Sequence, residues 1–176
     1  MVTSGGVPRK LREEEEGAIH HVFARGNNRG ALFVDDVDRV AYLEFIGRAV
    51  TRCGWLCLAY CLMGTHVHLL IETPRPNLAA GMQGAHSRYA ELFNARHARS
   101  GHVFQGRYGG VRVRSDAQLI GVAQYIDRNP VDAGLVSSTS QWPWGSAGAL
   151  ARDEAPGWLA AERLGELGVS RPALVA

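Results

Sequence analysis

Two consecutive apolar segments, residues 55–63 and 66–72, are separated only by Gly64 and Thr65. The first segment is hydrophobic at nearly every position, as expected of a central strand that is covered on both faces. The tight connection predicts that the second segment pairs with it as a neighbouring antiparallel strand. The chain therefore has to fold around the middle of a β-sheet, with other segments covering that sheet.

The second of these segments carries two histidines in the sequence THVHLLIE, residues 65–72. Side chains at positions i and i+2 of a strand point to the same face of the sheet. His66 and His68 therefore project together from one side, where they could hold one metal ion between them. A histidine pair on an apolar strand is more often structural, so its meaning depends on what else reaches this face.

The remaining patterns predict two more strands and two helices around this pair. A strand over 19–25 ends at the turn-rich segment 26–30, and an edge strand over 108–113 alternates valine with arginine. One helix, capped by Asp36 or Asp38, ends at Gly54, and a second runs from residue 78 to about 97. The residues predicted to face inward are Val40, Leu43, Ile46, Ala49 and Val50 in the first helix, and Met82, Tyr89, Leu92 and Phe93 in the second.

A third helix is expected to begin at a cap on Asp116. It is expected to end near Arg128, because the residue before Pro130 disfavours helical geometry. The order βαββαβ plus this helix predicts an α+β, ferredoxin-like sandwich: an antiparallel sheet with helices on one face and the active site on the other. We expect a flexible segment over residues 1–17, the domain over 18–136, and an extension over 137–176, with a short helix at 159–167, that packs on the domain.

The composition is ordinary for a globular domain, with 46% hydrophobic and 20% charged residues. No apolar stretch approaches the roughly 20 residues that span a bilayer. Residues 1–10 lack the hydrophobic core of a signal peptide, so we expect a cytoplasmic protein. Cys53, Cys57 and Cys61 are expected to be reduced thiols. A zinc site is not expected, because Cys57 and Cys61 would lie about 13 Å apart along one strand.

Positive charge is concentrated in one part of the chain. Residues 75–114 contain seven arginines and a single acidic residue, Glu91, although the net charge of the whole chain is only +2. Arginine's planar guanidinium suits bidentate contacts to phosphate and stacking on bases. A block of this kind points to a polyanionic partner, with nucleic acid as the leading candidate, or to a solvated basic face.

Tyr125 and Asn129 are four residues apart on the third predicted helix and therefore share one of its faces. If that helix lies across the open face of the sheet, it brings a phenol and an amide oxygen to His66 and His68. Two imidazoles and one amide oxygen suit Mn²⁺ well and Mg²⁺ acceptably, with open positions for phosphate oxygens. Tyr125 would then be a nucleophile, deprotonated with the help of the metal or Arg128, because its ordinary pKa is roughly 10.

These motifs together resemble those of the single-tyrosine HUH transposases, and most closely the REP-associated tyrosine transposases. The similarity covers about residues 20–150, and its strongest stretch, residues 125–136, reads YIDRNPVDAGLV. Further matching stretches read HHVFARGN (20–27), AYCLM (59–63), HVHLL (66–70), NARH (94–97), GHVFQGRY (101–108) and QWPWGS (141–146). The family commonly has Pro-Asn before the first histidine, whereas this chain has Gly64 and Thr65, which changes the turn there.

The resemblance implies the ferredoxin-like fold and metal-dependent nicking of single-stranded DNA that leaves a 5′-phosphotyrosine and a free 3′-hydroxyl. It implies that His66 and His68 are ligands of Mg²⁺ or Mn²⁺ and that Tyr125 is the nucleophile. Asn129 sits where relatives place a third ligand. Strand transfer by such an enzyme needs no ATP, because the covalent phosphodiester keeps the bond energy.

Relatives of this kind act on palindromic repeats folded as hairpins, so the expected partner has both a duplex stem and an unpaired flank. Phosphate contacts would position this DNA, and unpaired bases would be read by stacking and hydrogen bonds. The expected assembly is a monomer or a homodimer. The candidate DNA-binding residues are Arg25, Asn27, Arg88, Arg96, Arg107, Tyr108, Arg112, Arg114 and Arg128.

Two other functional interpretations remain open. A protein of the same fold that has lost catalysis would bind DNA as a repressor or structural factor, although the presence of both histidines, Tyr125 and Asn129 argues against it. A relaxase or replication initiator shares the two-histidine motif but is expected to have a longer chain and other motifs.

Overall fold

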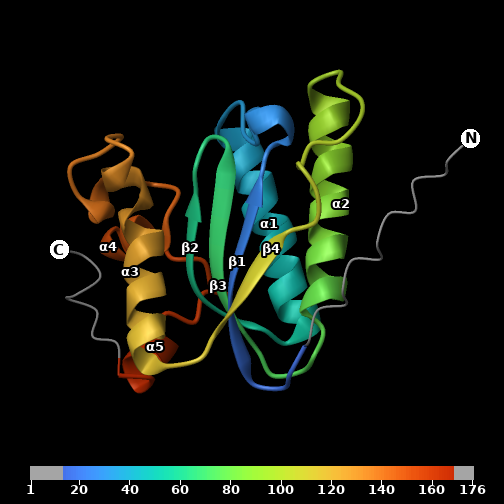
Figure 1. The fold of residues 1–176 in the computed structure, drawn as a ribbon. Helices are drawn as coiled ribbons and strands as arrows, with labels where there is room; N and C mark the ends of the chain where they lie inside the picture. The colour runs from blue at the N-terminus through green and yellow to red at the C-terminus, as the bar shows by residue number, and fades with distance from the viewer. Residues whose placement is uncertain (1–13, 169–176) are drawn as a thin grey trace, which may run out of the picture.

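The computed structural model describes residues 14–168 and shows a sheet with helices on both sides (Figure 1). Most of the segment expected to be flexible, residues 1–17, lies outside the described residues, as does the end of the predicted extension. The elements in chain order are β1 (Ala18–Arg25), η1 (Asn27–Arg29), α1 (Asp36–Cys53), β2 (Leu56–Leu62), β3 (His66–Thr73), α2 (Leu78–Arg96), β4 (Gly109–Val113), α3 (Asp116–Asp132), η2 (Thr139–Gln141), α4 (Ser146–Ala151) and α5 (Glu162–Glu166).

The four strands are all antiparallel to their neighbours and lie in the order β2-β3-β1-β4. Helices α1 and α2 pack together and cover one face of the sheet, and α3 lies against β2 and β3 on the other face (Figure 1). The ferredoxin-like prediction is therefore confirmed, including the edge position of β4. The expected central strand is also confirmed, since β2 is buried along almost its whole length.

The sheet separates two hydrophobic clusters. The larger lies between the sheet and α1 and α2, and the smaller lies between the sheet, α3 and α5. Cys57 belongs to the first cluster and Cys61 to the second, because β2 has an irregular register between Cys57 and Ala59. A bulge of this kind shifts the alternation of side chains by one residue. The two thiols therefore lie on opposite faces of the sheet, in agreement with the expectation that they share no zinc ion.

Helix α1 begins one residue earlier than predicted. Asp35 is the N-cap and accepts a hydrogen bond from the backbone N–H of Asp38, whereas Asp38 itself is fully buried. The helix ends at Gly54, whose φ of 69° is left-handed, a conformation that glycine adopts without strain. Ile46, Ala49 and Val50 face the core as predicted.

The prediction that a side chain faces the core is wrong for two residues. Val40 is 48% exposed, because the buried stripe of α1 runs through Asp38 and Tyr42 on the neighbouring positions. Leu92 is 38% exposed for the same reason, since Tyr89 and Phe93 occupy the inward face of α2. At both places the buried positions are taken by polar or aromatic residues, and the aliphatic residue next to them is exposed.

Helix α3 is longer than predicted. It is capped by Ser115, not Asp116, and it continues through Pro130 to Asp132. After the proline the chain closes in a Schellman motif, in which Leu135 N–H bonds to the Pro130 carbonyl and Gly134, at φ 69°, supplies the left-handed residue. These closing bonds stabilise a helical end that the local preference at residue 129 disfavours. Tyr125 and Asn129 therefore lie on one uninterrupted helix.

Residues 139–167 pack along the outer edge of β2. Leu62 N–H bonds to the Trp144 carbonyl, and Ala160 N–H bonds to the Cys57 carbonyl. Ser146 contacts the backbone of Tyr60 and donates to Asp127 of α3. These contacts satisfy edge groups of β2 that would otherwise be unpaired. Among the described residues, no helix is long and apolar enough to cross a membrane.

Candidate active site

The two histidines of β3 lie on the face of the sheet that α3 partly covers. The ring centroids of His66 and His68 are 5.2 Å apart, with the ring planes nearly perpendicular. His66 is half-buried, and His68 is only 7% exposed. The structure thus brings the pair together on one face, in the arrangement expected from their i, i+2 spacing.

Helix α3 places Asn129 beside the first histidine. The Oδ1 atom of Asn129 lies 3.4 Å from Nε2 of His66. The amide nitrogen of Asn129 donates to the Tyr125 carbonyl at 3.0 Å, which fixes the amide so that its oxygen faces the imidazole. On the other side of the ring, the Thr65 hydroxyl lies 3.2 Å from Nδ1 of His66. When Nδ1 carries the proton of this contact, Nε2 keeps its lone pair directed toward the Asn129 oxygen.

Tyr125 is the exposed member of the group. Its side chain is 49% exposed, and its ring centroid lies 5.3 Å from that of His68 in an edge-to-face arrangement. The phenol is therefore close to the histidine pair and open to solvent. A residue in this position is accessible to a polymeric substrate, which a fully buried tyrosine would not be.

His21 of β1 is a member of the site that the sequence motifs did not single out. Its Nε2 atom lies 3.0 Å from Nδ1 of His68, and its ring centroid is 5.8 Å from that of Tyr125. The signal was available in the alternation of β1, which places Ile19, His21, Phe23 and Arg25 on the face opposite to Val22 and Ala24. The pairing of β1 with β3 then makes His21 a diagonal neighbour of His68.

The three imidazoles are held in the neutral form. Burial lowers the pKa of His68 to about 3, and the neighbouring His21 and His66 add to this effect. Burial is also the main cause of the lowered pKa values of His21 and His66, and for His66 the nearby charge of Arg25 contributes in the same direction. At neutral pH each ring therefore offers an unprotonated nitrogen, the form that binds metal ions.

The donor set fits a divalent metal ion. His66 Nε2 and Asn129 Oδ1 already face each other, and His68 has one nitrogen left after its contact with His21. Within residues 14–168, no group of three or more His, Cys, Asp or Glu side chains is placed to hold a metal. The mixed set of two imidazoles and an amide oxygen is therefore the candidate metal site. This set suits Mn²⁺ or Mg²⁺, whereas structural zinc is usually held in closed sites that contain thiolates.

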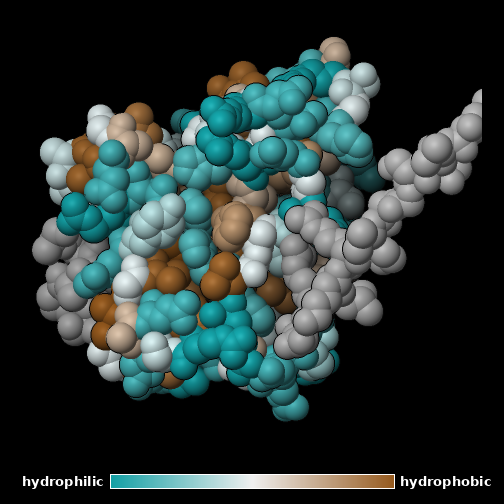
Figure 2. All heavy atoms as spheres, in the orientation of Figure 1, coloured by the Kyte–Doolittle hydropathy of each residue, from teal (hydrophilic) through white to brown (hydrophobic). Residues whose placement is uncertain are grey.

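Hydrophobic side chains are exposed next to this site. Phe23 of β1 is 38% exposed and Val111 of β4 is 49% exposed, and both lie on the same face as His21. Figure 2 shows hydrophobic atoms gathered in the middle of this face beside α3, with hydrophilic atoms above them. The ring centroid of Phe23 lies 6.3 Å from that of His68, and an exposed aromatic ring of this kind is a surface on which unpaired bases can stack.

The predicted DNA-binding residues are distributed over several surfaces. Arg25 pairs in register with His66 at the edge of the site, and Asn27 follows in η1. Arg107 is exposed at the rim of a cleft between α2 and the loop before β4. Arg114 follows β4, and its backbone N–H bonds to Gln118 at the start of α3. Arg128 is exposed on α3 and forms a loose ion pair with Asp132 at 3.4 Å.

The other predicted DNA-binding residues contact groups within the protein or lie on the far side of the sheet. Tyr108 is 5% exposed, and its ring packs in the cluster under α1 and α2, so it offers no ring face to a base. Arg96 binds Asp35 and the buried Asp38 at the start of α1. Arg112 pairs with Glu15 at 2.5 Å. Arg88 lies in the α1–α2 seam on the far side of the sheet. The structure therefore gives Arg96 and Tyr108 roles in packing, and their predicted contact with DNA stays a prediction.

The fold and this face define an α+β protein with a histidine pair, an amide and an exposed tyrosine on the open side of a ferredoxin-like sheet. The model of the IS200-like transposases matches residues 15–129, which is well over half of the chain. The chain therefore belongs to the IS200-like transposase family, as the motifs of the histidine and tyrosine segments predicted.

One solved structure agrees with this assignment at the level of the fold. The chain is similar to a REP-associated tyrosine transposase solved in complex with a REP hairpin, with a TM-score of 0.70 and 17% identity over 88% of this chain and 92% of that one. A weaker similarity, with a TM-score of 0.46 and 20% identity over 68% of this chain and 96% of the other, links it to a proposed transposase from Deinococcus radiodurans R1. No curated protein matches the chain in sequence.

Proposed function

We propose that this transposase is a metal-dependent single-strand DNA endonuclease and strand transferase that acts through a phosphotyrosine at Tyr125. The observation that carries the proposal is the position of Tyr125, whose exposed ring lies 5.3 Å from that of His68 on the helix that also carries Asn129. The proposed nucleophile and the proposed metal ligands thus face the same open surface.

The proposed reaction exchanges one phosphodiester bond for another. The Tyr125 oxygen attacks the scissile phosphorus, the bond from phosphorus to the 3′-oxygen breaks, and the proton lost by the phenol is balanced by the proton that the leaving 3′-oxygen gains. The products are a 5′-phosphotyrosine and a free 3′-hydroxyl. A second 3′-hydroxyl can reverse this step and join a new strand without any external energy source.

His66, His68 and Asn129 would hold the divalent ion. When bound, Mg²⁺ or Mn²⁺ supplies Lewis-acid polarisation of the phosphoryl oxygens. The chain's own contribution is to orient these side chains: Thr65 fixes the His66 ring, His21 fixes the His68 ring, and the Tyr125 carbonyl fixes the amide of Asn129. Such partners behind the ligands determine which nitrogen faces the ion.

The proposed substrate is hairpin DNA with an unpaired flank. The similar structure of a REP-associated tyrosine transposase contains a REP hairpin, and this similarity supports the same class of partner here. Phe23 and Val111 beside the site would contact unpaired bases, and Arg25 would contact a phosphate near the reacting bond.

The experiment uses purified protein and labelled hairpin oligonucleotides built from repeats that flank its own gene. We expect a band on a denaturing protein gel that joins protein to DNA, requires Mg²⁺ or Mn²⁺, and disappears with a chelator. His66→Ala should abolish this band even at high Mn²⁺. Tight binding of the hairpin without an adduct under any metal condition would contradict the proposal and favour a DNA-binding protein that has lost catalysis.

A further inference from the structure

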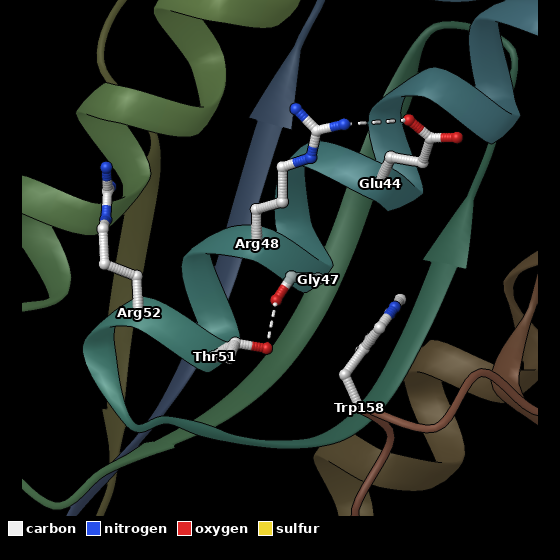
Figure 3. A pocket seen from close by; sticks show the side chains of 6 residues that line it. All are labelled: Glu44, Gly47, Arg48, Thr51, Arg52 and Trp158. Carbon is white, nitrogen blue, oxygen red and sulfur yellow. Dashed lines mark hydrogen bonds and ion pairs between the residues drawn. The ribbon is translucent and has the colours of Figure 1, made fainter.

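A basic groove lies on the opposite side of the sheet from Tyr125. The seam between α1 and α2 holds a cavity of about 200 Å³ whose charged lining residues are Arg48, Arg52 and Arg88. Small or apolar side chains form the rest of its lining, namely Phe45, Ala49, Gly84 and Ala85. Arg48 and Arg52 also border a second hollow on α1, which extends to Trp158 (Figure 3).

The arginines of this groove are poorly compensated by acidic groups. No carboxylate lines the α1–α2 cavity, and within residues 14–168 neither Arg52 nor Arg88 forms an ion pair. Arg48 pairs only with Glu44, at 3.5 Å, where both side chains are largely exposed and the interaction is weak. By contrast, Arg96 and Arg163 each bind two carboxylates.

The backbone of both helices makes room for this arrangement. A Cβ atom at Gly84 would lie 2.9 Å from Nη2 of Arg52, so the absence of a side chain there leaves space for the guanidinium in the seam. A Cβ atom at Gly47 would lie 2.5 Å from the Trp158 ring, which is packed closely against α1. Figure 3 shows Arg48 and Arg52 projecting from successive turns of α1, with Trp158 on the other side of the second hollow.

We propose that the groove formed by Arg48, Arg52 and Arg88 binds the phosphodiester backbone of a DNA segment outside the segment that is cleaved. Three guanidinium groups around a small cavity without carboxylates are complementary to phosphate. Because Tyr125 lies on the other side of the sheet, this DNA segment contacts a second face of the protein. The inference rests on the proposed function for the choice of DNA as the polyanion.

The test compares Arg52→Gln, Arg88→Gln and the double variant with wild type. The matched control is Arg152→Gln, since Arg152 lies in the extension outside the groove and pairs with Glu154. Binding is measured by fluorescence anisotropy over a range of salt concentrations. The two ligands are a hairpin with long flanks and a short oligonucleotide that contains only the cleavage site.

For the long DNA, each substitution should reduce the slope of log affinity against log salt by about one unit, and the double variant by about two. The short oligonucleotide and the control variant should show wild-type slopes. Inorganic phosphate at millimolar concentration should not displace the long DNA, because a single phosphate lacks the contacts of a polymer. Urea unfolding of each variant confirms that the fold is retained.

Wild-type slopes for Arg52→Gln and Arg88→Gln on long DNA would overturn the inference, even if the adduct at Tyr125 forms normally. The inference would also be overturned if an acidic peptide displaces the long DNA from these arginines while the variants keep the wild-type salt slope for DNA. If the variants show a reduced slope but the protein forms no adduct at Tyr125, DNA binding by the groove is supported and only the proposed catalysis is refuted.

Discussion

Nε2 of His21 lies 3.0 Å from Nδ1 of His68, across the adjacent strands β1 and β3. If His68 donates its Nδ1 proton to His21, the Nε2 atom of His68 keeps a free lone pair and the ring cannot rotate away. His21 thus acts as a positioning residue for a proposed metal ligand. The proposed ligand His66 receives the same kind of support from Thr65, so each imidazole has a partner on the side away from the ion.

Replacing His21 should weaken metal binding without affecting DNA binding. We expect His21→Ala to lower the affinity for Mn²⁺ by about 10–100-fold, because the His68 ring loses its orienting hydrogen bond. Isothermal titration of the DNA-free protein with Mn²⁺ measures this affinity. His21→Gln keeps an acceptor and should recover part of it, and exposed His102→Ala should behave as wild type. An unchanged Mn²⁺ affinity in His21→Ala would show that this contact does not position a ligand.

Phe23 should contribute to binding of unpaired bases. Removing its ring in Phe23→Ala is expected to weaken single-stranded DNA binding by about 1–3 kcal/mol, the usual effect of losing one base–aromatic stack. Gly109→Ala should act in the same direction, because its Cβ atom would meet the Phe23 ring at 2.1 Å and displace it. Gly106→Ala is the control, since a Cβ atom there contacts nothing within 4 Å. Equal affinities for all three variants in anisotropy measurements would exclude Phe23 from the DNA surface.

The topology and most of the site could be predicted from local patterns. The i, i+2 spacing of His66 and His68 and the i, i+4 spacing of Tyr125 and Asn129 are properties of single elements, so the sequence alone determined which side chains share a face. His21 was missed because its role depends on the register between β1 and β3. That register is set by tertiary packing, which no short motif in β1 encodes.

The features that local patterns did not reveal have similar physical origins. Helix α3 was predicted to stop before Pro130, because the rule about residues before proline is local, whereas the Schellman closure around Gly134 involves residues further along the chain. Arg96 was predicted to contact DNA because of its place in an arginine-rich segment. Its partners Asp35 and Asp38 are about sixty residues earlier in the sequence, and only the packing of α2 on α1 brings them together.

Arg96 should matter for stability rather than DNA binding. Burial opposes ionisation of Asp38, but bonds from Val34 N–H, His97 and Arg96 outweigh it and lower the pKa of the carboxyl. Arg96→Gln removes one of these partners and leaves a buried carboxylate less compensated. We therefore expect a clear fall in the urea midpoint, no change in hairpin affinity, and no change in either for Arg152→Gln. Weakened hairpin binding with an unchanged midpoint would return Arg96 to the DNA surface.

His86 should make stability depend on pH. Its ring stacks on Phe104 with centroids 4.1 Å apart and lies 3.1 Å from the Tyr42 hydroxyl, and burial lowers its pKa to about 4. Since this value lies below the unfolded value of about 6.5, the unfolded chain binds the proton first. The contribution of His86 to stability is therefore complete above about pH 6.5 and is lost as pH falls toward 4.

The variant His86→Phe keeps a ring for stacking but cannot titrate. Between about pH 7 and pH 4.5, wild type should lose about 2 kcal/mol more of its free energy of unfolding than the variant does. Urea unfolding at several pH values measures both curves. Parallel curves over this range would mean that His86 titrates alike in the folded and unfolded chains.

The proposed function requires that Tyr125 becomes bonded to the 5′ side of a cleaved DNA strand. The most direct measurement is mass spectrometry of the protein–DNA adduct after digestion with nuclease and protease. We predict a nucleotide phosphate on the peptide that contains Tyr125 and a free 3′-hydroxyl on the released strand, with no adduct from Tyr125→Phe, which should still bind the hairpin. A phosphonucleotide on any other residue, or an undiminished adduct in Tyr125→Phe, would contradict the account.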